Sequence, residues 1–226
     1  MDGNGRWARA RGLPRIAGHR SGAEAARRAV EAAAELGVPY LTLFGFSSEN
    51  WKRPANEVDD LMGLLRHYLR SEIAELNRNN IRLRVIGDRE RLPPDIVTLI
   101  EQTEALTDRN TRGTVAIALS YGGRAEIALA ARRIAAKAAA GLIDPAEVDE
   151  ACVAHHLLTA DMPDPDLVIR TSGEQRLSNF LLWQTAYAEF VFLDTLWPDF
   201  SKSDFEGALQ EFHARERRYG ATVGRR

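Results

Sequence analysis

The hydrophobic pattern alternates between short apolar runs and longer stretches of helical periodicity. The short runs, typical of buried strands, occupy residues 40–46, 81–86, 114–119, 167–169 and 190–193. Helices are expected over residues 21–36, 56–78, 94–106 and 123–140, and from residue 203. Strands that alternate with helices favour right-handed crossovers and parallel pairing. We therefore predict a single α/β domain over residues 1–226, with a mainly parallel central sheet flanked by helices.

Polar residues mark where some of these helices begin and end. Ser21 and Glu24 have the spacing of a capping box, which predicts a helix that begins at Ser21. Gly37 fits the left-handed position that follows such a helix. Asp144 before Pro145 predicts a further helix start, because aspartate caps helices and proline suits their first position.

Composition excludes several classes of function. The formal net charge of −2 creates no overall positive field that would attract nucleic acid. The single cysteine, Cys152, excludes an internal disulfide and a cysteine-rich zinc site, and it fits a reducing cytosol. The sequence shows no signal peptide and no run of 18 apolar residues, so we expect no transmembrane helix. We expect a cytoplasmic protein; composition does not test a peripheral contact with the inner face of the membrane.

The first residues combine glycines, a carboxylate and arginines. Gly3 and Gly5 let backbone N–H groups approach a ligand closely, and such groups form concave anion sites. Arg6 and Arg15 can add charge-assisted bonds to phosphate oxygens. Asp2 cannot bind a phosphate directly, so its presence suggests a bridging Mg²⁺. The alternative is an Asn-Gly turn at a fraying terminus.

A second cationic group follows the strand expected over residues 167–169. Arg170, Arg176 and Ser178 flank a turn at Gly173. Ligands of open α/β sheets bind beyond the carboxyl ends of strands, which is where this group would lie. A single arginine at such a place is usually part of a surface salt bridge. Two arginines, a serine and a glycine within nine residues favour a second anion site.

Several sequence blocks together carry a resemblance to a known family. They are MDGNGRWA with Arg15 and Gly18-His19, GFSSENWKRP at 45–54, SYGGR at 120–124, DLVIRTSGE at 166–174, RLSNFLLWQ at 176–184, LWPDF at 196–200 and RERRYG at 215–220. In this order they resemble the blocks of cis-prenyltransferases of the undecaprenyl diphosphate synthase type. The resemblance covers residues 1–220 and is far more specific than any one motif.

The resemblance implies two diphosphate sites and Mg²⁺ as the cofactor. The allylic diphosphate would be bound by Gly3, Asn4, Gly5, Arg6, Trp7, Arg15 and His19. Isopentenyl diphosphate would be bound by Arg170, Arg176, Leu177 and Ser178. Asp2 would bind the metal, with Glu189 as a second acidic contributor. The chain has no DDxxD-type acidic run of the kind that trans-prenyltransferases use, which favours the cis class.

Residues 47–53 would form a lid that excludes water from the reaction. The substrate contacts implied there are Ser47, Ser48, Glu49, Trp51 and Arg53. The family assigns Asn50 the proton lost from isopentenyl diphosphate. A neutral carboxamide is a poor base, so we expect Asn50 to orient the reacting group instead; with Asp2 it forms the catalytic pair. Trp7 and Trp51 are interpreted as substrate contacts, and packing in the core is the alternative.

The resemblance also makes the helix over residues 56–78 one wall of an apolar tunnel for the prenyl chain. Its apolar residues are Val58, Leu61, Met62, Leu65, Tyr68, Leu69, Ile73 and Leu76. Packing in the core predicts the same spacing, so periodicity does not separate the two interpretations. Gly45 and Gly113 are small, which is compatible with a long product. Farnesyl diphosphate as primer and undecaprenyl diphosphate, the lipid carrier of cell-wall synthesis, as product are implied by the resemblance alone.

The sequence differs from the family pattern at one place, and two other functions have to be weighed against the resemblance. Family members carry an apolar strand before the Asp-Gly-Asn-Gly-Arg turn, whereas Met1 stands directly before Asp2 here, so we expect the natural chain to begin upstream. A nucleotide-binding protein or phosphohydrolase would also use glycine turns and arginines, but the GxxxxGK[ST] loop is missing. A non-catalytic partner subunit would lack Asp2 and the arginines that this chain keeps. An active homodimer is therefore expected, with Arg218-Tyr219-Gly220 resembling a family element that reaches across the dimer.

Overall fold

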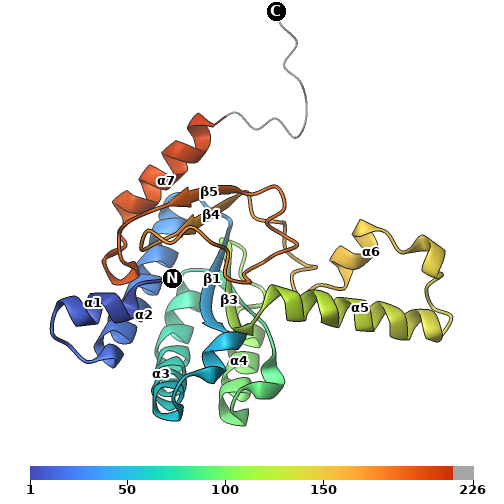
Figure 1. The fold of residues 1–226 in the computed structure, drawn as a ribbon, viewed down its shortest axis with the longest axis horizontal. Helices are drawn as coiled ribbons and strands as arrows, with labels where there is room; N and C mark the ends of the chain where they lie inside the picture. Colours follow the sequence, from blue (N-terminus) through green and yellow to red (C-terminus); the bar gives the residue numbers. More distant parts are fainter. Residues whose placement is uncertain (216–226) are drawn as a thin grey trace, which may run out of the picture.

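A computed structural model describes residues 1–215 of the chain (Figure 1). Its α-helices are α1 (Asn4–Ala10), α2 (Arg15–Glu35), α3 (Ala55–Arg78), α4 (Pro94–Thr107), α5 (Gly123–Ala139), α6 (Glu150–His155) and α7 (Lys202–Ala214). Its strands are β1 (Tyr40–Ser47), β2 (Ile81–Ile86), β3 (Gly113–Tyr121), β4 (Leu167–Arg170) and β5 (Glu189–Phe192). Short 3₁₀ helices are η1 (Ser48–Lys52), η2 (Arg89–Arg91), η3 (Pro145–Glu147) and η4 (Trp197–Asp199). The prediction of a parallel α/β domain is confirmed.

The five strands form two parallel sheets rather than one. The larger sheet has the order β1-β3-β2, and β4 pairs with β5 in the smaller one. A cavity of about 820 Å³ is lined by β1 on one side and by β4 on the other. Because β1 and β3 pair in parallel, they end at Ser47 and Tyr121 on the same edge of the larger sheet, and β4 ends at Arg170 in the smaller sheet. The loops that follow these strands carry the candidate site.

Two apolar clusters hold helices against the larger sheet. One joins α3 and α4 to the sheet through residues such as Met62, Leu83 and Ile96. The other packs the alanines of α2 against Trp197, Phe200 and the start of α7. Helices α5 and α6 instead extend away from this body at one side of the molecule (Figure 1). No helix within residues 1–215 is both long and apolar enough to cross a membrane.

The N-terminal region departs from the predicted elements. Helix α2 begins at Arg15, after Pro14 as its N-cap, so Ser21 lies inside the helix and the predicted capping box is wrong. Pro14 suits this start because it has no N–H group to leave unpaired, whereas the Ser-x-x-Glu pattern has no such constraint. Helix α1 was not predicted from the sequence. At Asp144 the cap forms, with the carboxylate accepting from Ala146 N, but only the single 3₁₀ turn η3 follows.

Candidate active site

Asp2 is fixed to two distant segments by its main chain. Asp2 N donates to Thr171 Oγ1 at 3.2 Å, and Ser172 Oγ donates to Asp2 O at 2.6 Å. Trp197 N donates to the same carbonyl at 2.9 Å. The first residues are therefore an integral part of the fold beside the carboxyl end of β4, and the interpretation as a fraying turn is excluded.

The Asp2 carboxylate is held by one arginine and one main-chain donor. Oδ2 accepts from Arg170 Nη2 at 3.0 Å, and Oδ1 accepts from Gly3 N at 2.8 Å. Burial acts to raise the pKa of Asp2, but the hydrogen bonds and charge of Arg170 together with the Gly3 bond lower the pKa below its ordinary value. The carboxylate is therefore ionised at neutral pH.

The glycine turn is the start of α1. Gly3 has a φ of 102°, and a Cβ there would lie 2.2 Å from Ser172 Oγ, so both conformation and space require glycine. The N–H groups of the first turn of a helix have no partner within the helix. A Cβ on Gly5 would lie 3.1 Å from Arg15 Nε, which shows how closely that guanidinium approaches the turn. The turn expected to bind an anion is thus a helix start rather than an open loop.

Two carboxylates hold the arginines of this region. Glu174 accepts from Arg6 Nη2 at 3.0 Å and also pairs with Arg176. Arginines assigned to different diphosphates, 170 positions apart, therefore share one acid. Sequence reasoning did not identify Glu174 as a site residue, because an acid inside a cationic motif gives no signal of its own.

Glu57 is the second carboxylate that pairs with arginines of this region. Its carboxylate lies 3.1 Å from Arg15 Nη1, 2.9 Å from Arg53 Nη1 and 3.7 Å from His19 Nε2. Burial lowers the pKa of His19, and the charges of Arg53 and Arg15 lower it further against the opposing effect of Glu57. His19 is therefore neutral at pH 7. No sequence signal separated Glu57 from the other acids of α3.

Arg170 connects Asp2 to the segment of residues 170–179, which we call the arginine loop. Its Nη1 donates to Ser178 Oγ at 3.0 Å and to the main-chain carbonyl of Arg176. Ser178 has a φ of 50°, and Leu177 lines the larger cavity beside it. The structure thus connects the second expected group to the Asp2 carboxylate through Arg170, whereas the Arg176 side chain pairs with Glu174.

Residues 47–53 form η1 and its flanks. Asn50 Oδ1 accepts from Ser47 N at 3.0 Å, so its carboxamide is engaged in the turn itself. Glu49 Oε1 accepts from Asn179 Nδ2 at 2.9 Å, which attaches η1 to the arginine loop. Ser48 lies where β3 turns into α5: a Cβ on Gly122 would come within 2.6 Å of its hydroxyl.

The two tryptophans of interest lie outside both cavities. Trp51 Nε1 donates to Ser120 Oγ at 2.9 Å, and its ring packs edge-on against Phe46 at 4.9 Å. Trp7 Nε1 donates to Asp199 Oδ1 at 2.7 Å, with the Arg11 guanidinium 4.2 Å from the centre of its ring. Neither ring faces a cavity, so the packing interpretation has more support at Trp51, and Trp7 fixes α1 to η4.

The structure does not bring Glu189 to Asp2. Glu189 begins β5, pairs with Leu167 in the sheet register and binds Arg215 Nη1 at 2.8 Å. Asp2 lies beside the other end of β4, three residues further along the strand, which is about 10 Å at the rise of a strand. Within one chain the two carboxylates therefore do not share an ion.

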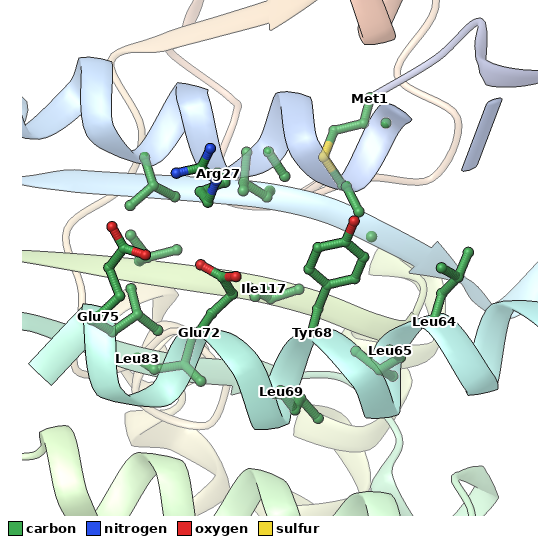
Figure 2. A pocket seen from close by; sticks show the side chains of 18 of the residues that line it. Met1, Arg27, Leu64, Leu65, Tyr68, Leu69, Glu72, Glu75, Leu83 and Ile117 are labelled. Atoms are coloured by element: carbon green, nitrogen blue, oxygen red, sulfur yellow. The ribbon is translucent and has the colours of Figure 1, made fainter. Parts of the chain in front are cut away.

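An apolar cavity of about 360 Å³ lies between α2, α3 and the larger sheet. Figure 2 shows Leu65, Tyr68, Leu69 and Ile117 around it. Asn4 and His19 line it at the end near Asp2, whereas Asn79 and Arg112 line it beyond the far end of α3. Of the apolar residues of α3, Val58, Met62 and Leu69 are buried in the core, and most of the predicted stripe also lines the cavity. Its use as the wall of a tunnel for the prenyl chain stays a prediction.

The remaining expected element lies outside the described residues. Arg218-Tyr219-Gly220 belongs to residues 216–226, so its place relative to the site is not part of the structure. Thr171 and Ser172, which hold the Asp2 main chain, were missed although they lie inside a quoted block. Their small hydroxyls carry no charge that would have marked them.

Comparisons with known proteins show which family the chain is similar to. The family model described as "Putative undecaprenyl diphosphate synthase" matches residues 1–220. The chain is 56% identical over 225 residues to "Isoprenyl transferase 2" of Bradyrhizobium diazoefficiens, covering 100% of this chain and 89% of the relative. It is 57% identical over 220 residues to "Isoprenyl transferase" of Rhizobium meliloti, covering 97% and 89% of the two chains.

Solved structures are similar over most of the chain. Lavandulyl diphosphate synthase from Lavandula x intermedia, in complex with dimethylallyl diphosphate, has a TM-score of 0.95 and 39% identity, covering 97% of this chain and 95% of that one. A "probable undecaprenyl diphosphate synthase" from Campylobacter jejuni has a TM-score of 0.79 and 38% identity, covering 89% and 92%.

Proposed function

This chain belongs to the undecaprenyl diphosphate synthase family of prenyltransferases, and we propose that it lengthens an allylic diphosphate by cis addition of isopentenyl diphosphate. One observation carries the proposal: Arg170 holds Asp2, and Glu174 pairs with both Arg6 and Arg176, so the two groups of arginines lie together beside an end of an apolar cavity. A diphosphate with a hydrocarbon tail uses both regions, because arginines bind phosphate oxygens and the cavity covers apolar surface. Farnesyl diphosphate is the expected primer.

The allylic head group belongs at the start of α1, where the first N–H groups have no partner within the helix, Arg6 stands in the first turn and the Arg15 guanidinium lies close to Gly5. Isopentenyl diphosphate belongs at the arginine loop, with Arg170, Arg176 and Ser178. At 4 Å and an effective dielectric constant near 20, one such charge pair contributes roughly 4 kcal/mol before desolvation. Each head group would compete with Glu57 or Glu174 for its arginines, so several donors are needed for binding.

Mg²⁺ fits beside Asp2 when substrate oxygens complete its coordination. Within residues 1–215 no three His, Cys, Asp or Glu side chains group in a way that could hold a metal. Mg²⁺ commonly takes one or two carboxylates together with phosphate oxygens and waters, and Asp2 supplies one ionised carboxylate that is 39% exposed. Bound there, the ion would neutralise charge on the departing diphosphate. Arg170 keeps the carboxylate oriented and deprotonated.

The residues of the chain act by binding and orientation. The allylic C–O bond breaks, the double bond of isopentenyl diphosphate forms the new C–C bond, and the isopentenyl unit loses a proton to the departing diphosphate. Arg6 and Arg15 stabilise charge on that leaving group. Asn50 is engaged by Ser47 N, which suits an orienting residue better than a base. The turn of residues 47–53 keeps water from the reacting carbons.

The product is a long cis-polyprenyl diphosphate, taken to be undecaprenyl diphosphate for cell-wall lipid carrier synthesis. Its chain would extend along α3 from Asn4 and His19 towards Asn79. The enzyme acts as a homodimer in the cytoplasm, with peripheral membrane contact when the product leaves. The exposed alanines of the projecting helix α5, at Ala128, Ala131 and Ala135, support a close helix contact between two copies.

Incubation with radiolabelled isopentenyl diphosphate, farnesyl diphosphate and Mg²⁺ tests this function. We expect incorporation that EDTA abolishes, and chromatography of the products measures their length. Nucleotide turnover without incorporation would favour a phosphohydrolase. Incorporation only after addition of a second protein would favour a non-catalytic subunit.

A further inference from the structure

Asn179 joins three segments that lie far apart in the sequence. Its Oδ1 accepts from Arg124 N at 2.9 Å, and its main-chain carbonyl accepts from Gly123 N at 2.7 Å. Its Nδ2 donates to Glu49 Oε1 at 2.9 Å. One residue of the arginine loop is therefore bonded to the start of α5 and to η1.

The orientation of this carboxamide is determined by its two partners. Arg124 N is a main-chain group that can only donate, so the oxygen of the amide must face it. The ionised Glu49 carboxylate can only accept, so the nitrogen must face η1. Asn179 has a φ of 64°, a left-handed conformation that asparagine tolerates better than most residues.

Asn179 and Ser48 both approach Gly122 closely. A Cβ on Gly122 would lie 2.7 Å from Asn179 Nδ2 and 2.6 Å from Ser48 Oγ. Glycine at this position thus lets η1, the arginine loop and the start of α5 meet. A shift of one of these segments would move the others.

The contacts continue from Asn179 to the Asp2 carboxylate. The preceding residue, Ser178, accepts from Arg170 Nη1 at 3.0 Å, and Arg170 Nη2 donates to Asp2 Oδ2 at 3.0 Å. Elsewhere η1 is attached through Trp51, whose Nε1 donates to Ser120 Oγ and whose ring packs against Phe46 and the Arg91 guanidinium. Glu49 is thus the point at which η1 is connected to the groups assigned to the second diphosphate.

We propose that Asn179 is a positioning residue that holds η1 against the arginine loop, so that binding of isopentenyl diphosphate at the loop also orders the turn carrying Asn50. The inference rests on the proposed function. Asn179 acts through Glu49 and Ser178 and does not itself bind the substrate. The competing explanation is that Asn179 only caps the start of α5 through Arg124 N.

Asn179→Asp separates the two explanations. Aspartate keeps an oxygen for Arg124 N but places a second carboxylate oxygen beside Glu49. If Asn179 only caps α5, this variant should behave as the wild type. If it positions η1, kcat/KM for isopentenyl diphosphate should fall about tenfold or more, with little change in KM for the allylic substrate.

Glu49→Gln in the Asn179→Asp background restores a donor and an acceptor with their places exchanged. We expect the double variant to exceed, by about fivefold or more, the kcat/KM expected if the two single effects multiplied. Multiplicative effects, or wild-type parameters for Asn179→Asp, would overturn the inference. Wild-type incorporation is measured first, so a failure of the proposed function is recognised separately.

Asn80→Asp is the matched control. Asn80 is also left-handed, with a φ of 55°, and its amide accepts from Thr111 N and donates to Thr111 Oγ1 far from the site. This variant should keep wild-type kinetics. If Asn179→Asp does not fold, Glu49→Ala removes the same contact from the other segment and leaves the bond from Arg124 N to Asn179 intact. This variant should lower kcat/KM for isopentenyl diphosphate with little change in KM for the allylic substrate, and wild-type kinetics would contradict the inference.

The pH profile gives a second readout that a purely structural residue would not change. Burial acts to raise the pKa of Glu49, but hydrogen bonds led by that from Asn179 lower the pKa below its ordinary value. Asn179→Asp removes that donor and adds a negative charge, so the acid limb of kcat/KM should move to higher pH. An acid limb at the wild-type position would count against the proposal.

Discussion

The two regions that would hold the two ends of a prenyl diphosphate are built on opposite principles. In the polar cleft around Asp2, the arginines are already paired with acids of the same chain, namely Asp2, Glu57 and Glu174. In the apolar cavity along α3, side chains such as Leu65 and Leu69 line an empty volume. A charged ligand must therefore displace existing partners in the cleft, whereas a hydrocarbon tail only has to fill the cavity.

This difference predicts how specific each region is. Binding in the cleft is an exchange of partners, so it depends on the geometry and charge of each residue. Binding in the cavity scales with the apolar area covered, at roughly 25 cal/mol per Å², and depends little on any one side chain. Substitutions in the cleft should therefore abolish steps of the reaction, while those in the cavity should change the length of the product.

Asp2→Ala should have the largest effect. We expect kcat to fall on the order of 10³-fold with a modest change in allylic KM, because stabilisation of a departing charge is lost rather than ground-state binding. Steady-state kinetics with both substrates measure this. Asp108→Ala, which breaks the comparable pair with Arg82 at 2.6 Å far from the cleft, should leave kcat unchanged. Near-normal kcat in Asp2→Ala would show that the cleft does not carry the chemistry.

Arg176→Ala and Arg170→Ala come next and separate binding from orientation. Loss of a charge-assisted contact to a diphosphate should raise KM for isopentenyl diphosphate about 10²-fold in both. Only Arg170→Ala should also lower kcat, because Arg170 alone of the two holds the Asp2 carboxylate. Arg82→Ala, which removes an arginine paired with Asp108 far from the cleft, is the control and should leave both KM and kcat unchanged. An unchanged KM in both variants would remove the arginine loop from isopentenyl binding.

Gly45→Leu tests the cavity and should change the product more than the rate. A Cβ on Gly45 already lies 3.1 Å from Leu119 Cδ2 and 3.3 Å from Ile117 Cγ2, so a larger side chain reduces the cavity and strains its wall by about 1–3 kcal/mol. The first addition should persist while the mean product length falls, measured by chromatography. Gly63→Leu on α3, where an added Cβ meets nothing within 4 Å, should leave the length unchanged. Products of wild-type length from Gly45→Leu would mean that the chain runs elsewhere.

The smallest effect concerns His19, where the cleft meets the cavity. Its pKa is lowered by burial and by Arg53 and Arg15, so the folded protein takes up this proton less readily than the unfolded chain. Its contribution to stability is therefore present above the unfolded pKa, near 6.5, and is lost as the pH falls through the lower folded value. Thermal unfolding from pH 8 to pH 5 should show a shallower loss of Tm in His19→Asn than in the wild type. Parallel curves would contradict this assignment.

Much of the fold could be predicted because its signals are local. The five strands were predicted within two residues at each end, and Gly37 follows α2 with a φ of 73° as expected. The start of α2 was predicted wrongly. Ser21 and Glu24 have the spacing of a capping box, but α2 already begins at Arg15, with Pro14 as its N-cap. The division into two sheets was also missed, since strand pairing depends on partners far away in the chain.

The candidate site divides in the same way. The cationic residues and Asp2 were identified from the sequence, because charge and glycine spacing mark anion sites wherever they lie. Nothing in the sequence indicated a role for Glu57, Glu174 and Asn179. An acid or an amide becomes part of a site only through the groups that it contacts in the fold. The role of Glu189 as a second metal ligand stays a prediction, because within one chain Glu189 and Asp2 lie at opposite ends of the β4 and β5 pair.

By itself the sequence determined which chemistry is available: two groups of arginines, an early carboxylate and an apolar helical stripe, since residue type and spacing are properties of the chain. Only the tertiary structure decided that Arg170 orients Asp2, that acids already occupy the arginines, and that the stripe borders a cavity. The physical reason is that hydrogen bonds and ion pairs act over a few ångströms, while these partners are separated by up to 168 positions along the chain.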